Sequence, residues 1–234
     1  KIVKSKIANN SASCSSENAV AVEENVFNEM VSALEAEGGH LCNSVERERL
    51  REYYWPDGKS LNRDVIAKPV EHLAKQAKIK IPKGTRFLMV MGKNPGPADR
   101  FSGEKISLVL TLWKWNNFNE MIKRIKVMLD FSGKGHSISI HSTKEDRHVE
   151  LATQMNVGRV NCNMPHAMAN SGSWFNGQSF TDSLGGGTWA GNNTSENIIW
   201  KHFLNYTCLS VPIPEFVPTD EDIFGNYLQK WGRE

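Results

Sequence analysis

The sequence lacks a surplus of charge of either sign, a long apolar run and a closely spaced pair of cysteines. Its 28 Lys and Arg residues are balanced by 26 Asp and Glu residues, so it has no strongly basic surface of the kind that nucleic-acid binding requires. No stretch approaches the roughly 18 consecutive apolar residues of a membrane span, and the N-terminus lacks the apolar centre of a signal peptide. These absences predict a cytoplasmic protein that binds small molecules, with neither nucleic acid nor membrane as a partner.

The four cysteines are Cys14, Cys42, Cys162 and Cys208, and no two of them form the C-x2-C spacing of a zinc motif. No metal site is therefore expected. In a cytoplasmic chain we expect free thiols, most of them buried and at most one of them reactive. The chain begins at Lys1 without a methionine, and its first ten residues read like the end of a helix, so we expect it to be part of a longer protein.

Apolar stripes that repeat every three to four residues predict amphipathic helices over 26–34, 118–129 and 223–231, the last with Thr219 as its N-cap. Apolar or alternating runs between them are typical of strands. Helices that alternate with strands in this way predict a layered α/β fold with a largely parallel sheet. The strand-like runs are 19–22, 86–91, 105–113, 137–141, 159–164 and 206–211.

Two segments, 92–103 and 165–193, interrupt this pattern with glycine, proline, asparagine and serine. Long irregular loops in a compact α/β domain often line a functional site, so both are candidate walls of an active site. Ordinary surface loops are the alternative.

Cys14 lies in a small, serine-rich turn directly before the strand predicted over 19–22. Such a turn leaves the thiol open while the sheet holds its backbone. Neighbouring N–H groups can favour the thiolate and receive an oxyanion, so Cys14 is a candidate nucleophile with Ser13 and Ser15 beside the substrate. An inert loop cysteine is the alternative.

The run SASCSSENAVAVEENVFNEM resembles the active-site segment of the CoA-acylating aldehyde dehydrogenases, a branch that includes the acetaldehyde half of bifunctional aldehyde-alcohol dehydrogenases. In that branch the nucleophilic cysteine is followed by a small residue, Ser, Glu and an apolar strand, as Cys14 is here. The hydrolytic aldehyde dehydrogenases tend to place Gly-Gln shortly before the cysteine, a feature that this sequence lacks.

Two further blocks follow in the family's order. The segment 101–107 resembles one in which a glutamate binds the ribose hydroxyls of the nicotinamide cofactor, and by position this role falls to Glu104. The segment 135–142 resembles a Gly-His-Ser entry to a strand. We interpret its histidines, His136 and His141, as packing and hydrogen-bonding residues, since no carboxylate-rich motif accompanies them.

A fourth block, 184–197, is similar to the stretch that closes over the active site in the acylating branch. It places Thr188 among the expected substrate contacts. The block departs from the family at two positions: Gly186 stands where the family usually has Cys, and Ala190 stands where it usually has Gly.

The resemblance implies a three-layer α/β/α catalytic domain over 1–205 with a mostly parallel, Rossmann-like sheet and an incomplete N-terminus. A return strand and helix over 206–234 would contact another subunit of a homo-oligomer, and the nucleotide-binding domain would be absent from this chain.

The implied activity is an NAD- or NADP-dependent oxidation of a small aldehyde through a thiohemiacetal and a thioester on Cys14, with coenzyme A as the acyl acceptor. The sequence looks most like the sulfoacetaldehyde-type enzymes of the branch, and His166 is a candidate contact for an anionic substrate. A hydrolytic aldehyde dehydrogenase and a non-catalytic module of the same fold are the alternatives.

Overall fold

The computed structural model describes residues 1–232, which divide into one unit at Lys1–His202 and a second that starts at Phe203. Within residues 1–232, no helix combines the length and the apolar character that crossing a membrane would require.

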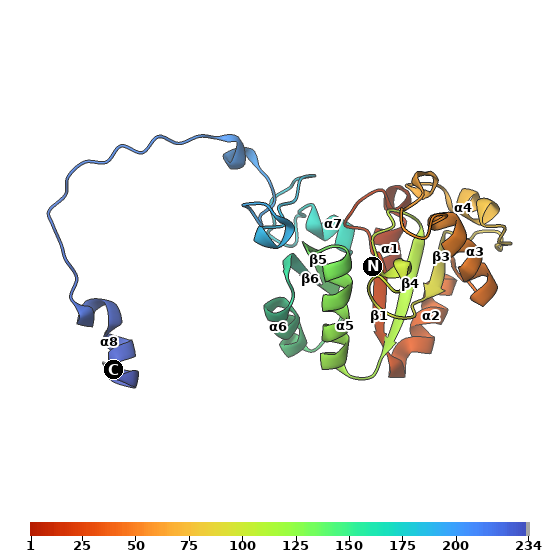
Figure 1. Cartoon of the computed structure of the whole chain (residues 1–234), viewed down its shortest axis with the longest axis horizontal. Coiled ribbons are helices and arrows are strands. Elements are labelled where there is room, and N and C mark those ends of the chain that lie inside the picture. Colours follow the sequence, from red (N-terminus) through yellow and green to blue (C-terminus); the bar gives the residue numbers. More distant parts are fainter. Residues whose placement is uncertain (233–234) are drawn as a thin grey trace. The chain divides into compact units, whose positions relative to one another are not determined.

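The first unit is built on two sheets in which every pair of neighbouring strands is parallel (Figure 1). One has four strands in the order β1-β4-β3-β2, and the other pairs β5 with β6. This arrangement confirms the predicted α/β fold. The strands are β1 (Ala19–Glu23), β2 (Gly39–Leu41), β3 (Phe87–Met91), β4 (Val109–Trp115), β5 (Gly135–Ile140) and β6 (Val157–Cys162).

In this unit, the strand predictions were wrong in two details. The run expected from residue 105 becomes a strand only at Val109, because Ile106 has a φ of 42° and turns the chain away from an extended path. The short strand β2 was not expected at all, since three residues carry too little pattern to read.

Seven α-helices of the first unit pack around the two sheets. The helices α2 and α5 match the predicted apolar stripes, whereas α3 and α6 were missed because charged residues dominate their sequences. The helices of this unit are α1 (Ile2–Lys6), α2 (Phe27–Ala36), α3 (Ser44–Tyr54), α4 (Val70–Gln76), α5 (Phe118–Phe131), α6 (Glu145–Gln154) and α7 (His166–Asn170).

Alternation along β1 shows that helices cover both faces of the larger sheet. Val20 and Val22 join the main core, which includes residues of α2, α3 and α4. Ala19 and Ala21 point to the opposite face and pack with α5. Ile125 of α5 also packs with the cluster over β5 and β6, so one helix contacts both sheets. The three predicted layers are therefore present.

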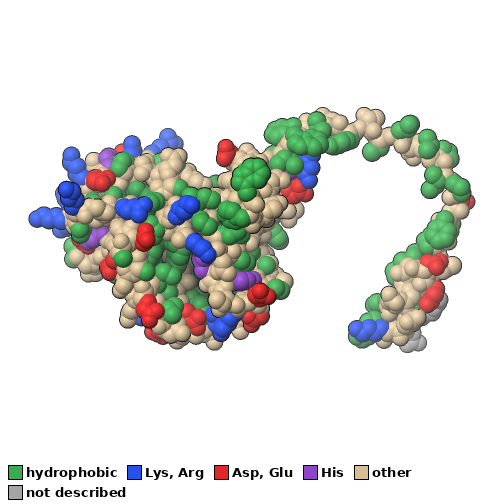
Figure 2. Space-filling view, turned by 180° about the vertical axis from the view of Figure 1, so that it is seen from behind, with side chains coloured by type: hydrophobic (Ala, Val, Ile, Leu, Met, Phe, Trp, Pro, Cys, Tyr) green, Lys and Arg blue, Asp and Glu red, His purple; other side chains and the backbone are tan. Residues whose placement is uncertain are grey.

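The second unit contains the helix α8 (Asp220–Trp231). Its predicted N-cap is confirmed, because the Thr219 side chain accepts from the Asp222 N–H and Asp222 binds the Thr219 N–H in return. The strand predicted over 206–211 is not formed, and these residues have no regular structure. A strand needs a partner to complete its hydrogen bonds, and residues 203–232 contain none. Figure 2 shows hydrophobic side chains along this segment. The exposed ones include Ile213, Phe216, Phe224, Tyr227 and Trp231.

Candidate active site

Cys14 lies in the connection between α1 and β1, just after a segment in which the chain reverses direction. Three successive residues, Asn9, Asn10 and Ser11, have positive φ angles of 47°, 52° and 60°. Asparagine tolerates this left-handed conformation better than most residues, which explains why the chain can reverse here without glycine. The thiol that follows is exposed, as predicted from the sequence.

His136 lies directly beside this thiol. Its Nε2 is 3.1 Å from the Sγ of Cys14, although the two residues are far apart in the chain. Gly135, which precedes it, has a φ of 83°, and a Cβ there would lie 2.6 Å from the carbonyl oxygen of Gly186. Only glycine fits, so the Gly-His pair fixes how the chain enters β5 and where the imidazole points.

The His136 ring is suited to receive a proton at neutral pH. Burial lowers the pKa of His136 below its usual value, and the nearby positive charge of Arg159 lowers it further. The ring is therefore neutral at pH 7 and has a lone pair for a hydrogen of Cys14. The sequence drew attention to this histidine but gave no indication that it contacts the thiol.

Behind His136, a partly buried polar network extends away from the thiol. The Nδ1 of His136 is 2.7 Å from the Ser137 hydroxyl, which lies 2.9 Å from the Nε2 of His166 and accepts a hydrogen bond from the Asn170 amide. The same amide donates to Ser15 at 3.0 Å. Ser137 and Asn170 had not been predicted, and no sequence pattern marks either of them.

His166 is buried, and burial lowers its pKa to about 4, with smaller contributions from His136 and His141. At neutral pH it offers a hydrogen bond but no positive charge, so it is not a cation for an anionic substrate. Ser13 is exposed at the turn and accepts from the Ser15 N–H at 3.2 Å, whereas the Ser15 side chain is buried.

A cavity of about 440 Å³ brings four of these groups together: Cys14, Glu104, His136 and His166 all line it. Its apolar wall comes from β1, β4 and α5 and includes Ala21, Trp113 and Met121. Thr188 is exposed and is not among the lining residues.

Glu104 stands at the end of the predicted loop, where its N–H donates to the Ser132 hydroxyl at 3.1 Å. The residue is exposed, yet partial burial of its carboxyl group raises the pKa of Glu104, and the charge of Lys105 opposes that rise. A solvent-accessible carboxylate in the cavity of Cys14 fits the hydrogen-bonding needs of a ribose diol.

The glycine-rich loop lies against the entry to β5. Arg159 fixes this loop with two hydrogen bonds. Its Nε donates to the Asn197 side chain at 2.8 Å, and a terminal nitrogen donates to the Gly185 carbonyl at 3.0 Å. A Cβ on Gly186 would meet the Cβ of Ala190 at only 2.5 Å. The two departures from the family pattern therefore compensate for each other, because the Ala190 methyl fills the space that a side chain at position 186 would need.

A buried ionisable pair anchors the Cys14 turn. Lys6 of α1 is buried and donates to the Ser107 carbonyl at 2.7 Å, which ties α1 to the approach of β4. Burial lowers the Lys6 pKa to about 7, while the negative charge of Glu17 opposes this shift. Glu17, three residues after the thiol, is itself buried and accepts from the His166 N–H at 3.4 Å, so contacts hold the turn on both sides.

This parallel α/β domain, with an exposed cysteine before its edge strand β1, is similar in fold to a solved aldehyde dehydrogenase. A crystal structure of a probable aldehyde dehydrogenase from Listeria monocytogenes matches it with a TM-score of 0.88 and 25% identity, over 92% of this chain and 47% of that one. No family model matches the chain.

The chain belongs to the acylating aldehyde dehydrogenase family, which confirms the resemblance of its motifs. It is 37% identical to the sulfoacetaldehyde dehydrogenase (acylating) of Bilophila wadsworthia, over 98% of this chain and 50% of that protein. The chain thus spans about half the length of the curated relatives that it matches.

Solved structures with this fold include proteins with cofactors bound. An engineered glycolyl-CoA reductase holds NADP+ (19% identity, TM-score 0.70, covering 83% of this chain and 43% of that one). A propionaldehyde dehydrogenase of Rhodopseudomonas palustris holds CoA and an acylated cysteine (18% identity, TM-score 0.69, with the same coverage). At these identities the likeness shows the fold alone.

Proposed function

We propose that this chain is the cysteine-bearing part of a CoA-acylating aldehyde dehydrogenase, with Cys14 as the nucleophile and His136 as its proton acceptor. The observation that carries the proposal is the 3.1 Å contact between an exposed thiol and a neutral imidazole on the wall of one cavity. A thiol activated by an adjacent base is the general arrangement of cysteine nucleophiles.

The network behind His136 supports its role, because it selects the required tautomer. Buried His166 is neutral and can accept the Ser137 hydroxyl hydrogen at Nε2. The Ser137 oxygen then accepts from Nδ1–H of His136, which leaves the His136 Nε2 lone pair for the Cys14 hydrogen. The Asn170 amide donates to the same oxygen and is consistent with this direction.

In the first half-reaction, the Cys14 sulfur adds to the aldehyde carbonyl as its proton moves to His136. The backbone N–H of Cys14 makes no hydrogen bond within residues 1–232 and is free to donate to the resulting oxyanion. A preorganised donor of this kind commonly contributes about 3 kcal/mol. Glu104 is the residue that would hold the ribose of NAD or NADP, which supplies hydride acceptance when bound.

In the second half-reaction, the thiol of coenzyme A attacks the thioester carbonyl on Cys14. His136 has by then released the first proton to solvent. The bond from that carbonyl to the Cys14 sulfur breaks, and the CoA proton passes through His136 to Cys14. One thioester replaces another, so no activated water is needed. The words acylating and acetylating in the names of the relatives support acyl transfer, and the CoA bound to the propionaldehyde dehydrogenase of Rhodopseudomonas palustris supports this acceptor.

The substrate we propose is a small aldehyde, with sulfoacetaldehyde favoured by the name of the 37% identical relative. Because His166 is neutral, a sulfonate would be bound by N–H and O–H donors. Ser13 offers an exposed hydroxyl on the Cys14 turn, although it is not among the residues that line the cavity. Thr188 remains a candidate contact only if the glycine-rich loop moves. If acetaldehyde outperforms sulfoacetaldehyde in saturation kinetics of the complete enzyme, the anionic substrate is excluded.

We also propose that the protein forms a homo-oligomer through the segment that starts at Phe203. Its apolar side chains are exposed along 203–232, and burial against another subunit would remove them from water. Sedimentation of the complete enzyme tests this, and a monomer contradicts it.

Acyl transfer to Cys14 tests the function without needing the nicotinamide cofactor. The chain is incubated with acetyl-CoA and, separately, with a small acyl thioester, and intact-mass spectrometry measures the acetyl adduct. We expect one adduct, mapped to Cys14 and lost in Cys14→Ser. Cys208, which is also exposed but has no histidine contact in residues 1–232, is the internal control. Equal acylation of Cys208 and Cys14 would refute the proposal.

A further inference from the structure

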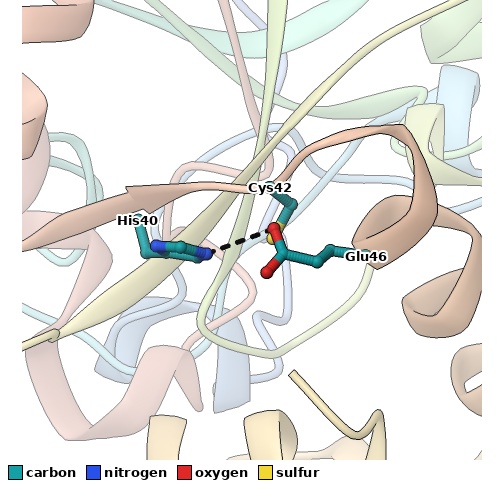
Figure 3. A group of neighbouring side chains, drawn as sticks. All are labelled: His40, Cys42 and Glu46. Carbon is teal, nitrogen blue, oxygen red and sulfur yellow. Dashed lines mark hydrogen bonds and ion pairs between the residues drawn. The ribbon is translucent and has the colours of Figure 1, made fainter. Parts of the chain in front are cut away.

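A second group of ligand-type side chains lies at the opposite edge of the larger sheet. It consists of His40, Cys42 and Glu46, whose ligand atoms all lie within 4.8 Å of one another (Figure 3). Cys14 precedes the amino end of β1, whereas Cys42 follows the carboxyl end of β2. Because β1 and β2 are the two edge strands of a parallel sheet, this group is separate from the Cys14 cavity.

The local sequence fixes how these side chains converge. His40 and Cys42 are two residues apart on an extended segment, so their side chains point to the same side. Glu46 is in the first turn of α3, where Asn43 is the N-cap and the two form a capping box. The Glu46 Oε2 accepts from the Asn43 N–H at 2.9 Å, which holds the carboxylate close to the strand end.

The distances and free atoms match what a metal ion needs. Two ligands about 2.0 Å from a tetrahedral ion are about 3.3 Å apart. The Nε2 of His40 and the Oε2 of Glu46 are 3.3 Å apart. The other Glu46 oxygen, Oε1, and the Cys42 sulfur have no hydrogen bond within residues 1–232. The sulfur is therefore available as a ligand, and the Oε2 of Glu46 can bind the ion while it still accepts from the Asn43 N–H.

We propose that His40, Cys42 and Glu46 bind a Zn2+ ion, with solvent as the fourth ligand. A neutral imidazole, a thiolate and a carboxylate together carry two negative charges, which the ion balances. The Cys42 proton is released to solvent as the sulfur–zinc bond forms. The side chains of His40 and Glu46 are 19% and 16% exposed, so solvent has access to the open position. The site does not depend on the proposed acyl transfer.

Zinc affinity is measured by competition with a chromophoric chelator, in a Cys14→Ala background. That background is needed because Cys14 and His136 could bind zinc themselves. We expect one Zn2+ per chain. His40→Asn and Cys42→Ser should each weaken binding by at least about 100-fold, the upper end of what losing even an outer partner of a metal site costs. The matched control is His72→Asn, which removes a histidine paired with Asp64 at 3.0 Å but with no thiol nearby, and should leave affinity unchanged.

Cobalt provides a second readout that does not rely on a folded Cys42 variant. Co2+ added to the Cys14→Ala protein should produce a sulfur-to-cobalt charge-transfer band, which Zn2+ displaces. Absence of the band, absence of zinc binding, or unchanged affinity in both ligand variants would each overturn the proposal. Loss of acyl transfer by Cys14 would not, so failure of this inference and failure of the proposed function are distinguishable.

Discussion

Cys14 and Cys42 flank strands of the same parallel sheet, yet their surroundings differ in almost every respect. Cys14 is exposed before β1, and its sulfur contacts the neutral ring of His136. Cys42 is buried after β2, where burial and the charge of Glu46 raise its pKa to about 12 in the metal-free chain. The contrast teaches that position at the sheet edge does not make a thiol reactive. Solvent access and a proton acceptor do.

The largest expected effect is the difference in alkylation between these two thiols. In the native chain, iodoacetamide should label Cys14 at least about 1,000-fold faster than Cys42, because a buried thiol reacts only through openings that cost several kcal/mol. Peptide mapping by mass spectrometry measures both rates, and Cys208 should fall between them. Equal labelling of Cys14 and Cys208 would mean that exposure alone, and not His136, explains the reactivity.

Removal of the proton acceptor should have the next largest effect. His136→Gln should slow acyl transfer to Cys14 by about 100-fold, the usual contribution of a general base. The wild-type rate should fall as pH drops through the His136 pKa, which lies below 6.5, since the protonated ring cannot accept a proton. In His136→Gln, the acyl-transfer rate should no longer fall as the pH drops through the His136 pKa.

The matched control for that variant is His141→Gln, because His141 lines the same cavity but does not contact the thiol. Its rate and pH profile should stay close to those of the wild type. An equal loss in both variants would show that the cavity, rather than the His136 contact, determines the rate.

The sequence predicted some features of the two thiol regions and missed others. Cys14 and the strand after it were readable, because a polar turn before an apolar run has a clear pattern. The pairing of Cys14 with His136 was not, since it joins residues 122 positions apart. Sequence periodicity carries no information about such long-range contacts. Asn170 is the last residue of the short helix α7, inside a segment expected from the sequence to be an irregular loop, and no sequence pattern marks it.

The sequence analysis missed the group of His40, Cys42 and Glu46 for a different reason. A search for C-x2-C spacing cannot detect a set of ligands that mixes His, Cys and Glu across a strand end and a helix start. The Asn43–Glu46 capping box was nevertheless readable in the sequence, and it would have placed the start of α3. The charges of α3 concealed its few core residues, such as Leu50 and Tyr54.

On the Cys14 side, the paired departures in the glycine-rich loop should show strong coupling. Gly186→Cys alone should destabilise the chain by about 1–3 kcal/mol, because its Cβ would overlap the Ala190 methyl. Adding Ala190→Gly should restore most of that loss, giving a coupling energy of about 0.5–3 kcal/mol. Denaturant unfolding of the four proteins in the cycle measures it, and strict additivity would contradict the compensation.

The smallest expected effect comes from removing the N-cap of one helix near each thiol region. Asn43→Ala removes the cap of α3, and Asn117→Ala removes that of α5, where Asn117 accepts from the Glu120 N–H at 3.1 Å. Each should cost about 1 kcal/mol in the free energy of unfolding. Only Asn43→Ala should weaken zinc binding, because only that cap positions Glu46, and neither variant should change the acyl-transfer rate of Cys14. If both caps affect zinc binding equally, the two regions are coupled through the sheet and do not act independently.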